Sequence, residues 1–230
     1  MDNNQGQSFS CSNCAALDQS ILKILSNKKP EMLEMVQHGL IYETHSDLLT
    51  QGTQVKGVYC INSGRLKIYK NSESGKEQII RFAKRGDLLG FRTLIGGHKL
   101  GVSATTIEDC TVCFVERRDF FKMIQAVPEI KEKLLEELSE DLAEMVEALT
   151  TMAQSSVSSR LCSALLLLDE LYDNQGINLS RENLANFVGT AQESIIRKLS
   201  EMKNDELIAI NGRKITIINR AAITKTSLFS

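Results

Sequence analysis

The chain has 230 residues, 42% hydrophobic and 24% charged, which suits a soluble globular protein of one large or two modest domains and excludes disordered and collagen-like chains. The longest apolar run, Ala164 to Leu168, is far shorter than the roughly 20 residues that cross a bilayer, so we expect no membrane partner. The net charge of -2 is unusual for a nucleic-acid binder, but it averages an acidic segment, 128–152, with a modestly basic one, 174–230.

The first ten residues are polar, carry no positive charge and lead into no apolar stretch, which is unlike a secretory signal. We therefore expect a cytoplasmic protein. In that reducing compartment the six cysteines are expected to be free thiols, metal ligands or redox centres rather than structural disulfides.

Short β-branched or aromatic runs alternate with glycines from about Leu40 to Val115. The clearest runs are residues 58–61, 66–69, 78–82 and 111–115. Many short strands with turns every 8 to 12 residues predict an antiparallel β-roll of the double-sheet or jelly-roll kind, a fold that can enclose a small ligand. With flanking helices, this sensor domain is expected to occupy residues 1–127.

A long helix is predicted over residues 128–153, because Pro128 stands where a first helical turn accepts proline. Its apolar side chains follow a 3, 4, 3, 4, 3 spacing: Leu135, Leu138, Leu142, Met145, Leu149 and Met152. This is the rhythm of a two-stranded coiled coil. A helix that packs on its own domain is the alternative, but such a narrow stripe favours a partner helix, so we expect a homodimer.

The third predicted domain, residues 154–230, begins with a serine-rich hinge and a helix over 157–172. Ser180 caps the next helix, Ala185 is small where two helices must approach, and Gly189 suits a tight turn. A second helix follows from Thr190. This is a helix-turn-helix pattern, the arrangement that many DNA-binding proteins use.

Helical winding of residues 190–203 predicts one buried and one exposed face. Ile195, Leu199 and Met202 face the core, and the opposite face carries Thr190, Glu193, Arg197 and Ser200. A solvated charged face is the alternative to a base-reading surface. The hairpin that follows, with an Asn211-Gly212 turn, favours a winged helix-turn-helix in which Arg213 and Lys214 contact phosphates.

This order of parts resembles the Crp/Fnr superfamily of bacterial transcription regulators over nearly the whole chain. The matching stretches are residues 51–52, 59–66, 75–78, 86–90 and 184–199. The resemblance implies an α+β fold, double-stranded DNA with a palindromic site as partner, and RNA polymerase as a further partner. It also implies that Glu193 and Arg197 read a TGA core in each half-site, while Gln192 matches a variable position and Ser180 lies at the start of the DNA-binding helices.

The effector of the β-roll is unknown. In cyclic-AMP-binding relatives a Glu follows the glycine that corresponds to Gly90, and an arginine comes about ten residues later. Here Phe91 follows Gly90, and residues 97–104 contain no arginine, so we do not expect cyclic AMP to bind. Phe91, Arg92, His98 and Lys99 are candidates for a different pocket, with scattered surface charges as the alternative.

Cys11, Cys14 and Cys113 resemble three ligands of the four-iron cluster in oxygen-sensing Fnr proteins. Ser20 stands where those proteins have a further cysteine, and four thiolates are the usual complement. Only Cys60 or Cys110 could substitute, and Cys110 should face the other side of its strand. An iron–sulfur cluster, zinc, a reversible disulfide and no chemistry at all remain open for the cysteines.

The sequence contains no nucleophile elbow, P-loop, HExxH or dinucleotide fingerprint. We therefore do not expect an enzyme. The leading hypothesis is a homodimeric, sequence-specific DNA-binding regulator with an effector-responsive β-roll, and the alternative is a regulator that responds through its cysteines.

Overall fold

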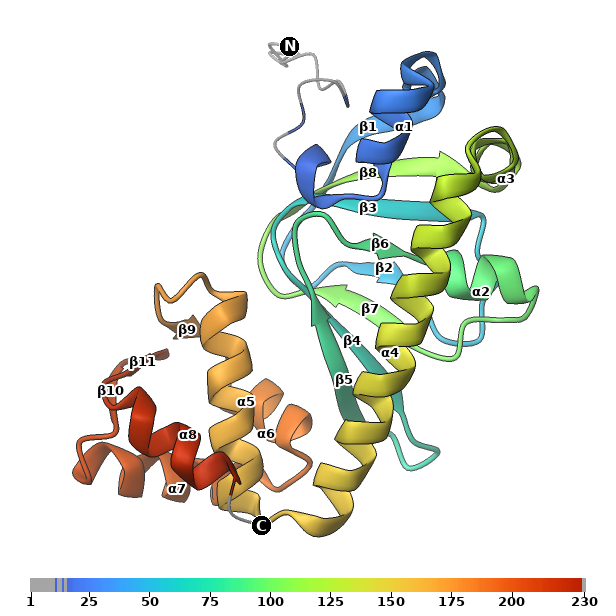
Figure 1. Cartoon of the computed structure of the whole chain (residues 1–230). Helices are drawn as coiled ribbons and strands as arrows, with labels where there is room; N and C mark the ends of the chain where they lie inside the picture. Colours follow the sequence, from blue (N-terminus) through green and yellow to red (C-terminus); the bar gives the residue numbers. More distant parts are fainter. Residues whose placement is uncertain (1–10, 12–13, 15, 229–230) are drawn as a thin grey trace, which may run out of the picture. The chain divides into compact units, whose positions relative to one another are not determined.

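The computed structural model describes residues 11, 14 and 16–228 (Figure 1). The described chain divides into two compact units: one contains the described residues up to 68 together with 82–140, and the other contains residues 69–81 and 141–228. Helical segments open the described part of the chain: η2 (Leu17–Gln19), α1 (Leu22–Lys28) and η3 (Pro30–Met35). Pro30 is accepted in η3 because it lies in the first turn, where no backbone donor is needed.

Within the described residues, eight strands form the β-roll. The strands are β1 (Val36–Tyr42), β2 (Asp47–Leu49), β3 (Gly57–Ser63), β4 (Leu66–Asn71), β5 (Glu77–Ala83), β6 (Leu88–Leu89), β7 (Ser103–Thr106) and β8 (Cys110–Glu116). They build two four-stranded sheets, in the orders β1-β8-β3-β6 and β2-β7-β4-β5. The predicted double-sheet architecture is confirmed. A short helix, α2 (Phe91–Gly96), follows β6.

The sheet that contains β8 is apolar on both faces. Cys110 and Val112 pack in the core between the two sheets, whereas Cys113 and Val115 pack beneath the N-terminal helical segments. Side chains alternate across a strand, so a strand buried on both sides becomes apolar throughout. This explains the run Thr111 to Val115, and it confirms that Cys110 and Cys113 face opposite sides.

Two helices follow the β-roll, α3 (Arg117–Ala126) and α4 (Pro128–Gln154). The first half of α4 packs on the sensor core through Ile130 and Leu134, which are buried. Its later apolar side chains, from Leu142 to Met152, are exposed. The long predicted helix is therefore present, and its apolar stripe is uncovered in the single chain.

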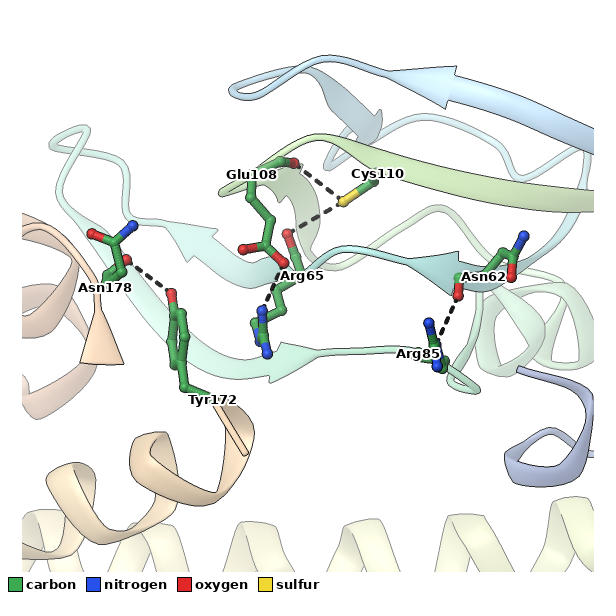
Figure 2. Close-up of polar contacts among 7 residues, drawn as sticks. All are labelled: Asn62, Arg65, Arg85, Glu108, Cys110, Tyr172 and Asn178. Atoms are coloured by element: carbon green, nitrogen blue, oxygen red, sulfur yellow. Dashed lines mark hydrogen bonds and ion pairs between the residues drawn. The ribbon is translucent and has the colours of Figure 1, made fainter. Parts of the chain in front are cut away.

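The C-terminal part contains α5 (Val157–Leu171), β9 (Ile177–Asn178), α6 (Arg181–Val188), α7 (Gln192–Asn204), β10 (Ile208–Asn211), β11 (Lys214–Ile217) and α8 (Arg220–Leu228). The three strands pair in the order β10-β11-β9. The hydroxyl of Tyr172 donates to the carbonyl of Asn178 at 2.9 Å, which ties the end of α5 to β9 (Figure 2). The predicted winged helix-turn-helix is confirmed.

Helix α8 was not anticipated from the sequence. It packs along α5, and the buried carboxylate of Asp169 accepts a 2.7 Å hydrogen bond from Arg220 at the first position of α8. The Ser159 hydroxyl donates to the carbonyl of Ser227 near its other end. The partners lie 51 and 68 residues apart, so no local pattern announces the helix.

The hairpin turn lies one residue later than predicted. Asn211 pairs with Lys214, so the two-residue loop is Gly212-Arg213 rather than Asn211-Gly212. Gly212 has φ +58°, which glycine adopts without strain. The predicted turn would place Ile210 opposite Arg213, whereas the observed pairing places Ile210 opposite Ile215 and Ile208 opposite Ile217, so apolar side chains face each other along the hairpin.

Candidate functional site

The helix-turn-helix is built by local signals in α6 and the turn. The Ser180 hydroxyl accepts a 3.0 Å hydrogen bond from the backbone N–H of Asn183, so Ser180 is the N-cap of α6. Gly189 ends the helix with φ +74°. Ala185 is buried, and its carbonyl accepts from the N–H groups of Gly189 and Thr190. The turn therefore holds the start of α7 at a defined angle to α6.

Helix α7 has the two predicted faces. Ile195, Leu199 and Met202 are buried, whereas Gln192, Glu193, Arg197 and Ser200 are exposed. The helix begins two residues later than predicted, so Thr190 lies in the turn, is half-buried, and does not belong to the exposed face of α7. The Arg197 side chain is 72% exposed, and its Nε lies 4.0 Å from Glu201 Oε1. Such a long ion pair at the surface contributes little, so the guanidinium is available to another partner. The Ser200 hydroxyl instead donates to the carbonyl of Ile196 in its own helix.

The wing carries the two predicted cationic residues, and hydrogen bonds from Arg181 hold it in place. Arg213 and Lys214 are exposed at the hairpin tip. The guanidinium of Arg181, at the start of α6, donates to the carbonyls of Arg213 at 3.2 Å and Gly212 at 3.4 Å. Burial and the nearby Arg213 charge lower the pKa of Arg181. The start of α6 and the wing thus bring together Arg181, Arg213 and Lys214.

Sequence reasoning missed two positioning residues. One is Arg181, and the other is Arg160 on α5, whose Nε donates to the carbonyl of Val188 at 3.0 Å. Arg160 Nη1 also donates to the carbonyl of Ser155 at 2.8 Å. Helix C-termini leave carbonyls without intrahelical partners, and Arg160 satisfies one at the end of α6. A lone arginine in a helix gives no sequence signal for such a role.

The residues predicted for an effector pocket have different environments. The Phe91 side chain is fully buried in the sensor core, and the Arg92 guanidinium lies 4.8 Å from the centre of its ring. His98 and Lys99 are exposed in the loop after α2. A cation over an aromatic ring is stabilised by the ring quadrupole, which accounts for the position of Arg92 without a ligand.

The cysteines are all free thiols, and four of them approach one another on the sheet face beneath the N-terminal helical segments. Cys60 on β3 is directly opposite Cys113 on β8. Cys11 hydrogen-bonds to Cys113, and Cys14 and Cys60 lie close enough to contribute to the raised pKa of Cys11. Ser20, which stands where oxygen-sensing Fnr proteins have a further cysteine, has its hydroxyl 3.3 Å from Cys60 Sγ.

Cys110 is excluded from this group. Its thiol donates to the backbone carbonyls of Arg65 at 3.4 Å and Glu108 at 3.3 Å, and the Arg65 side chain binds the Glu108 carboxylate at 2.9 Å (Figure 2). Nearby, Arg85 Nε donates to the carbonyl of Asn62 at 3.1 Å (Figure 2). Cys110 therefore closes a turn of the β-roll and is not available as a ligand beside Cys113.

The donor set does not fit a four-thiolate cluster in its observed arrangement. Within residues 11, 14 and 16–228, no three or more His, Cys, Asp or Glu side chains are gathered so that they could hold a metal ion. Cys14 donates to Asn62 Oδ1 at 3.2 Å, and Cys60 is hydrogen-bonded to Ser20.

Among residues 11, 14 and 16–228, no helix is both long and apolar enough to cross a membrane.

Two protein families match the chain. Residues 40–127 match the cyclic nucleotide-binding domain, and residues 159–226 match the Crp-like helix-turn-helix domain. The fumarate and nitrate reduction regulatory protein of Vibrio cholerae is 23% identical over 226 residues, which cover 95% of this chain and 90% of that protein. The regulatory protein HlyX of Actinobacillus pleuropneumoniae is 24% identical over 215 residues, covering 90% and 89%.

Solved structures share the fold. FixK2 from Bradyrhizobium japonicum superposes with a TM-score of 0.76 at 21% identity, covering 84% of this chain and 98% of that one. The c-di-GMP-responsive global regulator CLP from Xanthomonas campestris superposes with a TM-score of 0.71 at 21% identity, covering 82% and 99%.

Proposed function

Because the chain belongs to the Crp/Fnr superfamily of DNA-binding transcription regulators, we propose that it acts in the cytoplasm as a homodimer that reads a palindromic site in double-stranded DNA. The observation that carries this proposal is the exposed pair Glu193 and Arg197 on α7, opposite a buried face. Arginine bonds a guanine edge through two donors, and glutamate accepts from the cytosine amino group. The protein is a regulator and not an enzyme.

The dimer is supported by α4. Leu142 and Leu149 are 64% and 69% exposed at coiled-coil positions, together with Met145, and a run of exposed apolar side chains at this spacing favours a partner helix. Two parallel copies would present two copies of α7. Such dimers read half-sites about 34 Å apart, one turn of the duplex. An unidentified effector in the β-roll would shift the arrangement of the two α4 helices, and RNA polymerase would be the partner on DNA.

The proposal includes that the β-roll does not bind cyclic AMP. Phe91 is buried and Val102 precedes Ser103, so neither the carboxylate nor the arginine that holds a cyclic phosphate in relatives is present. The Ser103 hydroxyl instead accepts a 3.0 Å hydrogen bond from the backbone of Gln51. Cyclic AMP is expected to leave DNA affinity unchanged.

The test is binding of the purified protein to duplexes with a TGA-N-TCA-type palindrome and to scrambled duplexes of the same composition, at several salt concentrations. We expect the palindrome to be preferred at every salt concentration, because base contacts add to the salt-dependent phosphate contacts. Equal affinity for both duplexes throughout the range would refute the proposal.

A response through cysteine is a second candidate function, favoured by the contact among Cys11, Cys113 and His38. Anaerobic purification followed by absorbance, iron and zinc analysis distinguishes its forms. Stoichiometric iron or zinc would assign Cys11, Cys14 and Cys113 to a metal. Metal-free protein favours thiol chemistry, and metal-free protein whose thiols also resist oxidation would remove this function altogether.

A further inference from the structure

Cys113 lies opposite an irregularity in β1. Gln37 pairs with Phe114 and Leu40 with Val112, so two residues of β1, His38 and Gly39, oppose the single residue Cys113. Gly39 has φ +70°, the left-handed conformation that a bulge of this kind uses. A bulge re-aims the side chains beside it, and here the His38 ring and the Gly39 backbone N–H both reach the Cys113 sulfur. The strand pair thus builds a polar site for one thiol.

Cys11 completes this site from the N-terminal segment. Its Sγ lies 3.7 Å from His38 Nδ1 and hydrogen-bonds to Cys113. Cys11 and Cys113 are 3% and 5% exposed, so the two thiols are shielded from bulky reagents. Three groups on three segments therefore meet at one point.

The other two thiols of the region are engaged elsewhere. The Cys14 thiol donates to Asn62 Oδ1, and the Cys60 sulfur is hydrogen-bonded by Ser20. Among the described cysteines, only Cys11 and Cys113 have each other as a hydrogen-bond partner. This selects one pair out of four neighbouring thiols.

The two thiols differ in their hydrogen-bond partners. Cys113 is contacted by the Cys11 thiol, the His38 ring and the Gly39 backbone N–H, whereas Cys11 is contacted by Cys113 and His38. The sulfur with more donors around it is the better place for the negative charge of a thiolate nucleophile, and the neighbouring Cys11 thiol can resolve its oxidised form.

We propose that Cys113 is the site of oxidation by hydroperoxides and that Cys11 resolves it, so that an intramolecular disulfide ties the N-terminal segment to β8. The Cys113 sulfur attacks one peroxide oxygen, the O–O bond breaks, and the departing oxygen takes a proton to leave as water or an alcohol. The Cys11 sulfur then attacks the resulting sulfenic acid, the S–O bond breaks, and hydroxide leaves with the Cys11 proton as water. Two thiols are oxidised and one peroxide is reduced.

This inference deepens the cysteine-based candidate function and does not depend on DNA binding. The test uses full-length protein, reduced, freed of reductant under anaerobic conditions and treated with one equivalent of hydrogen peroxide. We expect an intact-mass loss of about 2 Da, reversed by dithiothreitol. Peptide mapping without reduction should join Cys11 to Cys113.

Variants divide the two roles. Cys11→Ser should stop at a sulfenic acid on Cys113, seen as a mass gain of about 16 Da, and dimedone present during denaturation should label that sulfenic acid. Cys113→Ser should lose both products. Cys14→Ser, Cys60→Ser and Cys162→Ser are matched controls that keep the Cys11–Cys113 bond, and circular dichroism verifies that every variant is folded. His38→Gln should slow the first step severalfold, because it removes one hydrogen bond to the thiolate.

Four results would overturn the proposal. These are a disulfide between Cys14 and Cys60, a bond between two chains, oxidation of Cys113→Ser at the wild-type rate, and iron or zinc in the reduced protein that Cys113→Ser loses. Palindrome binding of the same variants under reducing conditions separates the two hypotheses. Palindrome binding without disulfide formation would contradict this inference alone. Disulfide formation without palindrome binding would contradict the DNA-binding proposal alone.

Discussion

Arg160 of α5 donates a 3.0 Å hydrogen bond from Nε to the carbonyl oxygen of Val188, the last residue of α6. The contact joins two helices across 28 residues of sequence at the point where the helix-turn-helix turns. It makes the position of α7 depend on a residue that lies outside the helix-turn-helix.

Replacement of Arg160 by alanine should destabilise the C-terminal unit by about 2 kcal/mol, because charge-assisted hydrogen bonds to the Val188 and Ser155 carbonyls are lost. Urea unfolding of the full chain measures the effect. Arg160→Lys is the matched control, since it keeps the charge but lacks the planar fork, and should recover only part of the loss. An unchanged urea midpoint in Arg160→Ala would show that these hydrogen bonds do not contribute to stability.

Arg197→Ala and Arg213→Ala should weaken DNA binding in different ways. The first is expected to cost about 1 to 3 kcal/mol and to relax the preference at one base pair of each half-site. The second should weaken binding to all sequences alike and reduce the salt slope by about 1. Competition binding with single-base variants of the palindrome, repeated at several salt concentrations, compares them. The same sequence profile for both variants would contradict the assigned roles.

Arg181 should act on DNA through the wing as well as through its charge. Its guanidinium bonds two wing carbonyls, a geometry that lysine cannot reproduce. Arg181→Lys is therefore expected to lose most of the affinity that Arg181→Ala loses, with an unaltered base preference. Titrations of both variants against the palindrome provide the measurement. Full affinity in Arg181→Lys would mean that only the positive charge matters.

Leu142→Glu combined with Leu149→Glu should convert the dimer to monomers, because like charges would face each other along the α4 seam. Sedimentation at micromolar concentration measures the state, and palindrome affinity should fall with it. Glu147→Gln, on the same helix but off the seam, serves as control and should stay dimeric. A dimeric double variant would place the interface elsewhere.

The oxidation rate of Cys113 should depend on pH in a direction set by its lowered pKa. The reactive thiolate is present above that pKa and is lost as the pH falls through it. The rate should therefore reach its plateau well below about 8.5, the ordinary pKa of a thiol. Cys11→Ala removes the largest cause of the shift and should move the midpoint to higher pH. Identical profiles in wild type and variant would contradict this origin.

Local patterns in the sequence were sufficient to predict most of the helices and strands and the exposed face of α7. Glycine turns between β-branched runs predicted the β-roll, the 3-4 spacing predicted α4, and the Ser180 cap with Gly189 predicted the helix-turn-helix. The exposed face of α7 could also be predicted, because a helix repeats every 3.6 residues and its buried side chains identify its exposed ones. These features depend on neighbours within a few positions.

Contacts between distant segments were decided only by the tertiary structure. The wing turn lies one residue later than predicted, and this register pairs Ile210 with Ile215 and Ile208 with Ile217. Arg160 and Arg181 reach carbonyls about 30 residues away in the chain. Cys113 meets Cys11 and His38 only because β1 bulges beside β8 and the N-terminal segment covers that face. Sequence periodicity describes which face of an element is apolar, but strand register and long-range packing determine which side chains meet there.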